Sequence, residues 1–266
     1  MSETVVEFGR PPFSFALMEA GRALSEMSLL PAAQVPLRAA PSGDGHSVIV
    51  CPGFLTSDRS TGFLRRFIAS KGYETFGWEL GRNLGPGTTG GSFELLADKI
   101  HDAYQASGRK VSLVGWSLGG VMARELAKQF PEQIRQVVTL GSPISGKVEA
   151  STISWLYNQV AGQQPMPLYM QEMMENIAHP PTDVPSTSIF TKTDGIVHWR
   201  GCIEPKSKMT DNIEVYASHC GLGVNPIVYF AIADRLALPE NEWSPFDRQA
   251  SIWRRAAFPS SGHVYH

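Results

Sequence analysis

The stretch Val114-Gly115-Trp116-Ser117-Leu118-Gly119-Gly120 contains the pattern Gly-x-Ser-x-Gly and stands between a short apolar run and an amphipathic stretch. This context predicts a serine at a sharp turn from a buried strand into a helix. The small residues at 115, 119 and 120 let the strand and the helix approach closely, so the hydroxyl stays exposed. The backbone N–H of Leu118 then lies at a helix N-terminus, where it can stabilise developing negative charge. The alternative is an ordinary glycine-rich turn with a serine cap, which the flanking elements disfavour.

On both sides of this motif, short β-branched runs alternate with amphipathic helical stretches, which is typical of a parallel sheet covered on both faces. The predicted strands cover residues 48–51, 75–80, 111–114, 137–140, 188–190 and 213–216. The last core helix is predicted to begin at Asn225-Pro226, a cap followed by proline in the first turn. We therefore expect an α/β fold with a mostly parallel sheet, in a single domain over residues 1–266.

Three segments fall outside this alternation. Residues 11–30 predict an N-terminal amphipathic helix, and residues 240–266 form a tail without clear periodicity. Residues 144–185 separate two strands by far more than the ~2–6 residues usual for such a connection. We expect this long segment to be an inserted helical cap.

The composition points to a globular protein, with 42% hydrophobic and 18% charged residues. A formal net charge of -2 and the lack of a basic stripe argue against nucleic acid as a partner. No stretch approaches the ~20 apolar residues of a membrane span, and no basic head precedes an apolar run at the N-terminus. We expect no stable membrane insertion and a cytoplasmic location, and the oligomeric state stays open.

The chain resembles the α/β-hydrolase superfamily, in particular bacterial esterases and lipases, over about residues 47–238. The resemblance rests on the serine motif and on the order nucleophile, acid, base along the chain. It implies an α/β-hydrolase fold with eight mostly parallel strands, of which six or seven can be placed here. It also implies ester cleavage by a serine hydrolase, with neither a metal ion nor an organic cofactor.

A serine hydroxyl needs a base to accept its proton, and His219 is the candidate among seven histidines. It follows the predicted strand near 213–218 and opens the loop 220–223, which carries the base in the family. His198 is the main rival because it is close to Asp194. A histidine that only bonds to the backbone is the structural alternative.

The base needs an acid that fixes its tautomer, and Asp194 is the candidate. It follows the predicted strand near 188–192, at the edge of the sheet where the sites of such folds collect. A plain Asp-Gly turn is the alternative. Asp211 and Asp183 are weaker candidates because neither follows a strand.

The negatively charged oxygen of an acyl-transfer intermediate needs two donors. Leu118 supplies one backbone N–H, and the resemblance assigns the other to the backbone N–H of Phe54 in the loop 51–55. Many lipases carry His-Gly where this chain has Pro52-Gly53, so the usual bracing of that loop is absent from the sequence. A plain turn is the alternative.

The cap segment is rich in methionine, which adapts to apolar groups of different shapes. We expect an apolar acyl or alcohol pocket lined by Leu55, Trp116, Trp155, Met170 and Val197. The alternative, of equal weight, is that the methionines only pack the cap onto the body.

The three cysteines lack the spacing of metal ligands, and no metal site is expected. Cys202 and Cys220 stand close in sequence to Asp194 and His219. If this acid and base are neighbours in the fold, the two thiols come within disulfide reach. A cytoplasmic location would keep both thiols reduced, and both outcomes stay open. Cys51 is expected to be buried and unpaired.

Together these residues predict a carboxylic-ester hydrolase that acts through an acyl-enzyme, with a small-molecule ester of medium chain length as substrate. The same three side chains would serve an acyltransferase, a thioesterase or an amidase, because fold alone does not separate these activities. A non-catalytic binding module on the same scaffold is the alternative from another class. Such modules usually lack one of the three side chains, and none is missing here.

Overall fold

The computed structural model describes residues 11–91, 93–145 and 176–264. Within these residues, six strands form one sheet in the order β2-β1-β3-β4-β5-β6, and every neighbouring pair is parallel. All six predicted strands are confirmed, with shifted ends. Their bounds are β1 Ser47–Cys51, β2 Glu74–Gly77, β3 Val111–Trp116, β4 Ile134–Leu140, β5 Ser186–Phe190 and β6 Thr210–Glu214.

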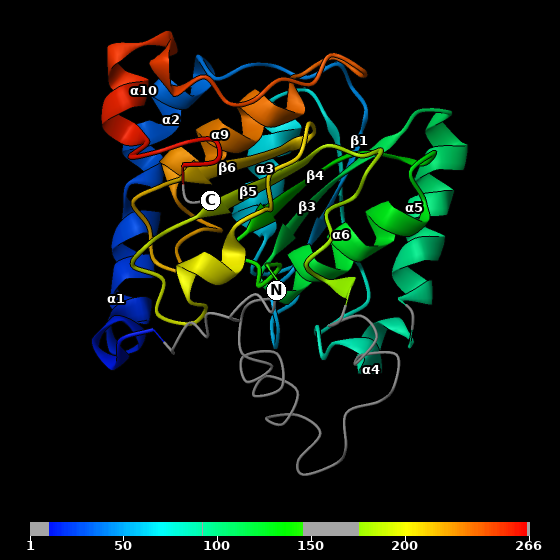
Figure 1. Ribbon diagram of the computed structural model, residues 1–266, viewed down its shortest axis with the longest axis horizontal. Helices are drawn as coiled ribbons and strands as arrows, with labels where there is room; N and C mark the ends of the chain where they lie inside the picture. Colours follow the sequence, from blue (N-terminus) through cyan, green and yellow to red (C-terminus); the bar gives the residue numbers. More distant parts are fainter. Residues whose placement is uncertain (1–10, 92, 146–175, 265–266) are drawn as a thin grey trace, which may run out of the picture.

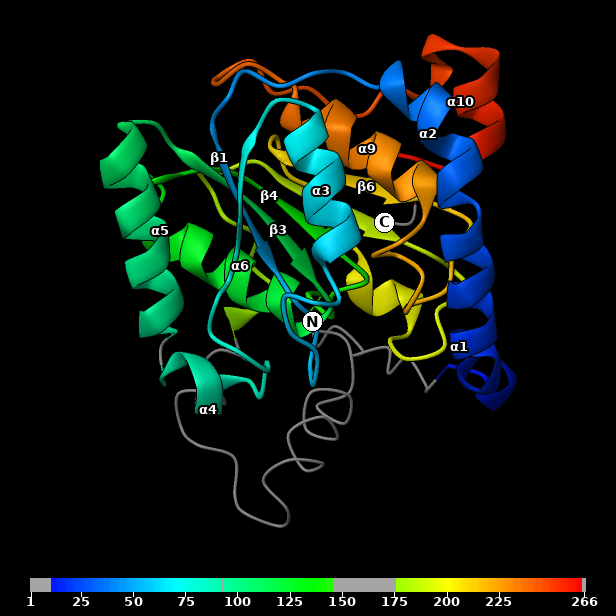
Figure 2. The same cartoon turned by 180° about the vertical axis from the view of Figure 1, so that it is seen from behind.

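Helices cover both faces of this sheet, as Figures 1 and 2 show from opposite sides. One face packs against α5 (Glu94–Ser107) and α6 (Leu118–Gln129), through a core that includes Ile49, Leu113 and Leu126. The other face packs against α3 (Gly62–Ser70) and α9 (Pro226–Leu236), through a core that includes Val48 and Val114. Neighbouring residues of one strand belong to opposite cores because strand side chains alternate between the two faces.

The N-terminal part of the described chain is helical, with α1 over Phe13–Ser28 and α2 over Leu30–Arg38. The resemblance implied eight strands, and the sheet formed by the described residues has six. Shorter elements are α4 (Pro86–Thr89), the 3-10 turns η1 (Trp199–Cys202) and η2 (Arg248–Ala250), and α10 (Ile252–Ala257). The expected cap falls mainly on 146–175, which lie outside the described residues.

Because all six strands run parallel, their carboxyl ends lie at one edge of the sheet. The loops after β1, β3, β5 and β6 carry Phe54, Ser117, Asp194 and His219 to this carboxyl edge. The strand order reverses between β1 and β3, a point where open α/β sheets commonly bind ligands.

Candidate active site

Ser117 stands between β3 and α6 in a strained backbone conformation, with φ 51° and ψ -121°. Non-glycine residues rarely adopt positive φ, and such strain persists only where the surroundings enforce it. The neighbouring glycines permit the sharp turn: a Cβ on Gly115 would lie 2.3 Å from the Cα of Gly120. Ser117 is only 5% exposed, so it is more buried than the sequence motif led us to expect. It precedes the first turn of α6, whose N–H groups have no partner within the helix. The sequence predicted this strand–turn–helix geometry from the motif.

Asp194 and His219 come together at the carboxyl edge through a hydrogen bond of 2.7 Å between Oδ2 and Nδ1. Both side chains are buried. The second carboxylate oxygen of Asp194 accepts hydrogen bonds from the backbone N–H groups of Ile196 (2.8 Å) and Val197 (2.7 Å). These bonds fix the carboxylate, so it presents one oxygen to the imidazole.

The pKa of His219 is raised above its ordinary value of 6.5. Burial acts against the charged imidazolium and lowers the pKa, but it is outweighed by the charge and hydrogen bond of Asp194 and by the charge of Glu19. A proton taken up by His219 is therefore stabilised where it forms.

Two contacts locate His219 relative to the serine turn. The indole Nε1 of Trp116, the residue before Ser117, donates to the backbone carbonyl of His219 at 3.1 Å. The backbone N–H of Ser117 donates to Leu140 at 2.8 Å, and a Cβ on the adjacent Gly141 would lie 3.1 Å from Nδ1 of His219. The serine turn and the Asp194–His219 pair therefore lie side by side.

The loop after β1 packs against the serine turn, since a Cβ on Gly53 would lie 3.5 Å from Cβ of Ser117. Phe54 follows Gly53 and is half-buried against the core of α5 and α6. The loop is braced by buried Asn83, whose Nδ2 donates to the carbonyl of Pro52 at 2.8 Å. The backbone N–H of Leu55 donates to the carbonyl of Asn83, also at 2.8 Å. Asn83 was not identified from the sequence, because nothing local connects residue 83 to residue 52.

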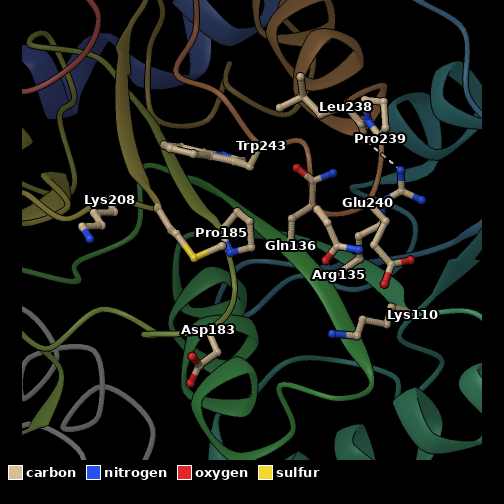
Figure 3. A pocket seen from close by; sticks show the side chains of 12 residues that line it. Lys110, Arg135, Gln136, Asp183, Pro185, Lys208, Leu238, Pro239, Glu240 and Trp243 are labelled. Atoms are coloured by element: carbon tan, nitrogen blue, oxygen red, sulfur yellow. Dashed lines mark hydrogen bonds between the residues drawn. The ribbon is translucent and has the colours of Figure 1, made fainter.

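The rival residues lie elsewhere. His198 caps η1, where its Nδ1 accepts from the N–H of Arg200 at 3.4 Å. The carboxylate of Asp211 accepts from the N–H of Phe246 at 2.6 Å. Asp183 lines a pocket at the opposite, amino edge of the sheet, together with Lys110 and Arg135 (Figure 3). Asp194 is thus the one of the three candidate acids that bonds to His219.

The expected pocket residues separate into three groups. Trp155 and Met170 lie outside the described residues. Leu55 is 49% exposed beside the serine turn, whereas Val197 is fully buried in a small core with Phe190 and Cys202. Trp116 is half-buried and holds the His219 loop, as described above. Within the described part of the predicted lining, Leu55 has the most exposed side chain.

The three cysteines are free thiols in the structure. Cys202 and Cys220 are therefore not bonded to each other in the structure, and Cys51 is buried. Burial, with the nearby charge of Glu19, raises the pKa of the Cys220 thiol to about 12. At neutral pH this thiol is therefore protonated and a poor nucleophile.

Glu19 was also missed by the sequence interpretation. Its carboxylate accepts from the backbone N–H of His219 and of Cys220, 200 and 201 residues away along the chain.

Among the described residues, no helix is both long and apolar enough to span a bilayer, and no cluster of side chains has the composition of a metal site.

Comparison with known proteins gives a family match and a set of similar structures. A model described as "Alpha/beta hydrolase family" matches residues 48–266. No curated protein sequence matches the chain. Lipase B of Aspergillus fumigatus is 18% identical, with a TM-score of 0.57 over 79% of this chain and 59% of that chain. This chain thus spans about three fifths of that lipase.

Two other lipases superpose over nearly their whole length. The mature Bacillus licheniformis lipase is 16% identical, with a TM-score of 0.53 over 75% of this chain and 95% of that chain. A monoacylglycerol lipase of Paleococcus ferrophilus is 16% identical, with a TM-score of 0.52 over 74% and 96%. At such identities the similarity concerns the fold, and together with the family match it confirms the predicted fold class.

Proposed function

The chain belongs to the alpha/beta hydrolase family, and from this premise we propose that it is a serine hydrolase that cleaves carboxylic esters. Ser117 is the proposed nucleophile, His219 the base and Asp194 its partner. The observation that supports this most is the 2.7 Å bond between Asp194 and His219, formed beside a serine held at φ 51°. A base oriented by a carboxylate, next to a strained serine, is the arrangement that acyl transfer requires.

In the proposed first step, Oγ of Ser117 attacks the ester carbonyl carbon while Nε2 of His219 accepts the hydroxyl proton. Nδ1 of His219 faces Asp194, which leaves Nε2 for this proton. The raised pKa of His219 favours the imidazolium that results. The carboxylate of Asp194 stabilises it.

The carbonyl oxygen becomes negatively charged in the tetrahedral intermediate. Leu118 at the first turn of α6 and Phe54 in the Asn83-braced loop are the proposed N–H donors to it. His219 then returns its proton to the departing alcohol, and Ser117 carries the acyl group. Water then attacks the acyl carbon while His219 accepts one of its protons. The bond from that carbon to Oγ breaks, His219 returns the proton to Oγ, and the carboxylic acid and free Ser117 are formed.

For the substrate we propose an ester with an apolar acyl or alcohol part of medium length. Leu55 supplies exposed apolar surface in the loop after β1, whose Gly53 packs against Ser117. Each buried methylene of substrate contributes about 0.8 kcal/mol, so kcat/KM is expected to rise a few-fold per carbon until the pocket is full.

Nitrophenyl esters of graded acyl length, assayed with and without an added alcohol, test this proposal. We expect hydrolysis that increases with chain length, and covalent labelling of Ser117 by a fluorophosphonate. Ester product formed mainly with the added alcohol would instead indicate an acyltransferase. Failure to label Ser117 in folded protein would contradict the nucleophile assignment and favour a binding module.

A further inference from the structure

Helix α1 presents charged side chains to the interior and apolar side chains to the outside. Glu19, Arg22 and Glu26 lie on successive turns and bond to the loops after β5 and β6, beside which α1 runs in Figure 1. On the outer side, Leu17 and Leu24 are 74% and 62% exposed. This orientation is opposite to the usual amphipathic helix, whose apolar face turns inward.

Glu19 joins the two loops that carry the proposed acid and base. Its Oε1 accepts from the backbone N–H of Gly195 at 2.8 Å and of His219 at 3.1 Å. Its Oε2 accepts from the N–H of Cys220 at 2.8 Å. One buried carboxylate thus holds both the residue after Asp194 and the backbone of His219.

Arg22 and Glu26 extend this connection by one turn each. The guanidinium of Arg22 donates to the carbonyls of Thr193 at 2.7 Å and of Ala217 at 2.5 Å, one from each loop. The carboxylate of Glu26 accepts from the N–H and the hydroxyl of Ser218, at 2.7 and 2.8 Å. Bonds to charged groups are stronger than neutral ones, so both loops are held firmly.

The helix also packs directly on the acid loop. A Cβ on Gly195 would lie 2.5 Å from the backbone carbonyl carbon of Phe15. No side chain could be placed between α1 and the turn that follows Asp194. The family match begins at residue 48, so this helix is additional to the region that the family model covers.

We propose that Glu19, Arg22 and Glu26, here called the α1 clamp, are positioning residues that hold the Asp194 loop and the His219 loop in register. The proposal rests on the proposed function, because register between these side chains matters only if they act together. A displacement of about 1 Å in a catalytic group can lower the rate 10²-fold. Contacts that prevent such a displacement of Asp194 or His219 therefore affect kcat.

Glu19 also acts on the charge of the imidazole. The charged and titratable groups around His219 are Asp194 from the loop after β5, Glu19, Arg22 and Glu26 from α1, and Cys220 from its own loop. The negative charge of Glu19 raises the pKa of His219. Removing that charge therefore lowers the pKa, and the acid limb of kcat/KM moves to lower pH.

Two variants of Glu19 separate positioning from bulk stability. Glu19→Gln keeps an oxygen that can accept from Gly195 and His219, but loses the acceptor for Cys220 and the charge. Glu19→Ala loses every bond. We expect kcat to fall about 10- to 10²-fold in Glu19→Ala and less in Glu19→Gln, with KM changed less than about threefold. In both variants the acid limb should move to lower pH.

Leu24→Gln, on the outer side of the same helix, is the matched control and should keep the kcat and the acid limb of the wild type. If Glu19→Ala does not fold, the nearly isosteric Glu19→Gln decides alone. A folded Glu19→Gln protein whose kcat and acid limb equal those of the wild type would overturn the proposal. A lower kcat with an unmoved acid limb would also overturn it, since that result indicates a structural role only.

An NMR titration of the His219 imidazole distinguishes failure of the clamp from failure of the proposed function, because it needs no substrate. A lower His219 pKa in Glu19→Gln, in a protein whose wild type cleaves no ester, supports the contact and rejects the esterase. Ester cleavage by the wild type with an unchanged His219 pKa in Glu19→Gln rejects the clamp and leaves the esterase standing.

Discussion

The amino edge of the sheet holds a second chain of serine, histidine and aspartate, which can be compared with the one proposed at the carboxyl edge. Nε2 of His46 lies 2.7 Å from Oγ of Ser112, and Nδ1 lies 2.5 Å from Oδ1 of Asp44. By distances alone, this group has the form of a catalytic triad, and its bond between aspartate and histidine is comparable to the 2.7 Å bond between Asp194 and His219.

The surroundings of the two serines differ. Ser112 is fully buried within β3, whereas Ser117 forms the turn between β3 and α6, with φ 51°. A helix N-terminus follows Ser117 at once, and none follows Ser112. A substrate carbonyl at Ser112 would meet neither open space nor oriented N–H donors. The comparison teaches that hydrogen-bond distances identify polar networks, while backbone strain and donors identify a nucleophile.

The charges around the two histidines also differ. Asp44 is paired with two arginines, since Arg135 and Arg109 donate to its Oδ2 at 2.8 and 2.7 Å. The pKa of His46 is lowered by burial and by the charge of Arg135, despite its bond to Asp44. At the carboxyl edge, the charge next to the Asp194–His219 pair is the carboxylate of Glu19 and not an arginine. The charges of Asp194 and Glu19 raise the pKa of His219.

The largest expected difference between the edges concerns the two serines. Ser117→Ala should remove essentially all ester hydrolysis, because attack has no other route. Ser112→Ala should keep kcat but leave buried His46 short of one partner, which costs roughly 1–3 kcal/mol of stability. Nitrophenyl ester assays with thermal unfolding measure both. Activity above about a tenth of wild type in folded Ser117→Ala protein would exclude Ser117 as the nucleophile.

The aspartates give the next largest contrast. Asp194→Asn should lower kcat by about 10³ to 10⁴, because the imidazole loses tautomer control and its partner charge. Asp44→Asn should keep kcat within about twofold and lower the unfolding temperature, since Arg135 loses its carboxylate. Steady-state kinetics of both variants provide the test. A kcat near that of the wild type in Asp194→Asn, with a large loss of kcat in Asp44→Asn, would place the catalytic acid at the amino edge.

Two buried asparagines, Asn83 at the carboxyl edge and Asn212 in the middle of β6, are expected to differ about tenfold in their effect on kcat. Asn83 holds the Phe54 loop through Pro52, and Asn212 in β6 holds Glu204 through two bonds of 2.8 and 3.1 Å. Asn83→Ala should lower kcat roughly tenfold, since one oxyanion donor becomes misplaced. Asn212→Ala, the matched control, should lower stability and spare kcat. Equal kcat values in Asn83→Ala and Asn212→Ala would contradict the proposed role of Asn83 in bracing the loop.

The sequence could predict the features that leave a local pattern. Strand periodicity located all six strands, and the Gly-x-Ser-x-Gly motif located the turn at Ser117. Asp194 and His219 could be proposed because each follows a strand, and parallel strands bring such loops to one edge.

The remaining contacts leave no such pattern. Glu19 is 176 residues from Gly195, and His46 is 66 residues from Ser112, so each pair meets only after the sheet has formed. The periodicity of α1 predicted an amphipathic helix but did not reveal that its polar side is buried. Single long-range hydrogen bonds depend on tertiary packing, and sequence periodicity reports only the local backbone and which face is apolar.

The smallest expected effect is a difference in titration between His219 and His46. An unperturbed histidine titrates near 6.5. His219 should titrate above that value, because Asp194 and Glu19 favour its charged form, and His46 below it, because burial and Arg135 disfavour its charge. NMR spectra of the imidazole signals across the pH range measure both. His46→Gln and Ser117→Ala variants serve to assign the signals.

These opposite shifts predict opposite effects of pH. A neutral His219 is needed to accept the proton, so the acid limb of kcat/KM should lie above about pH 6.5, and Ser112→Ala should not move it.

The raised pKa of His219 contributes stability below pH 6.5 that is lost as pH rises through the folded pKa. The lowered pKa of His46 contributes stability above pH 6.5 that is lost as pH falls through the folded pKa. His46→Gln should therefore lessen the acid-side loss of stability without shifting the acid limb. A limb that moves with His46 and not with Glu19 would mean that the catalytic base lies at the amino edge.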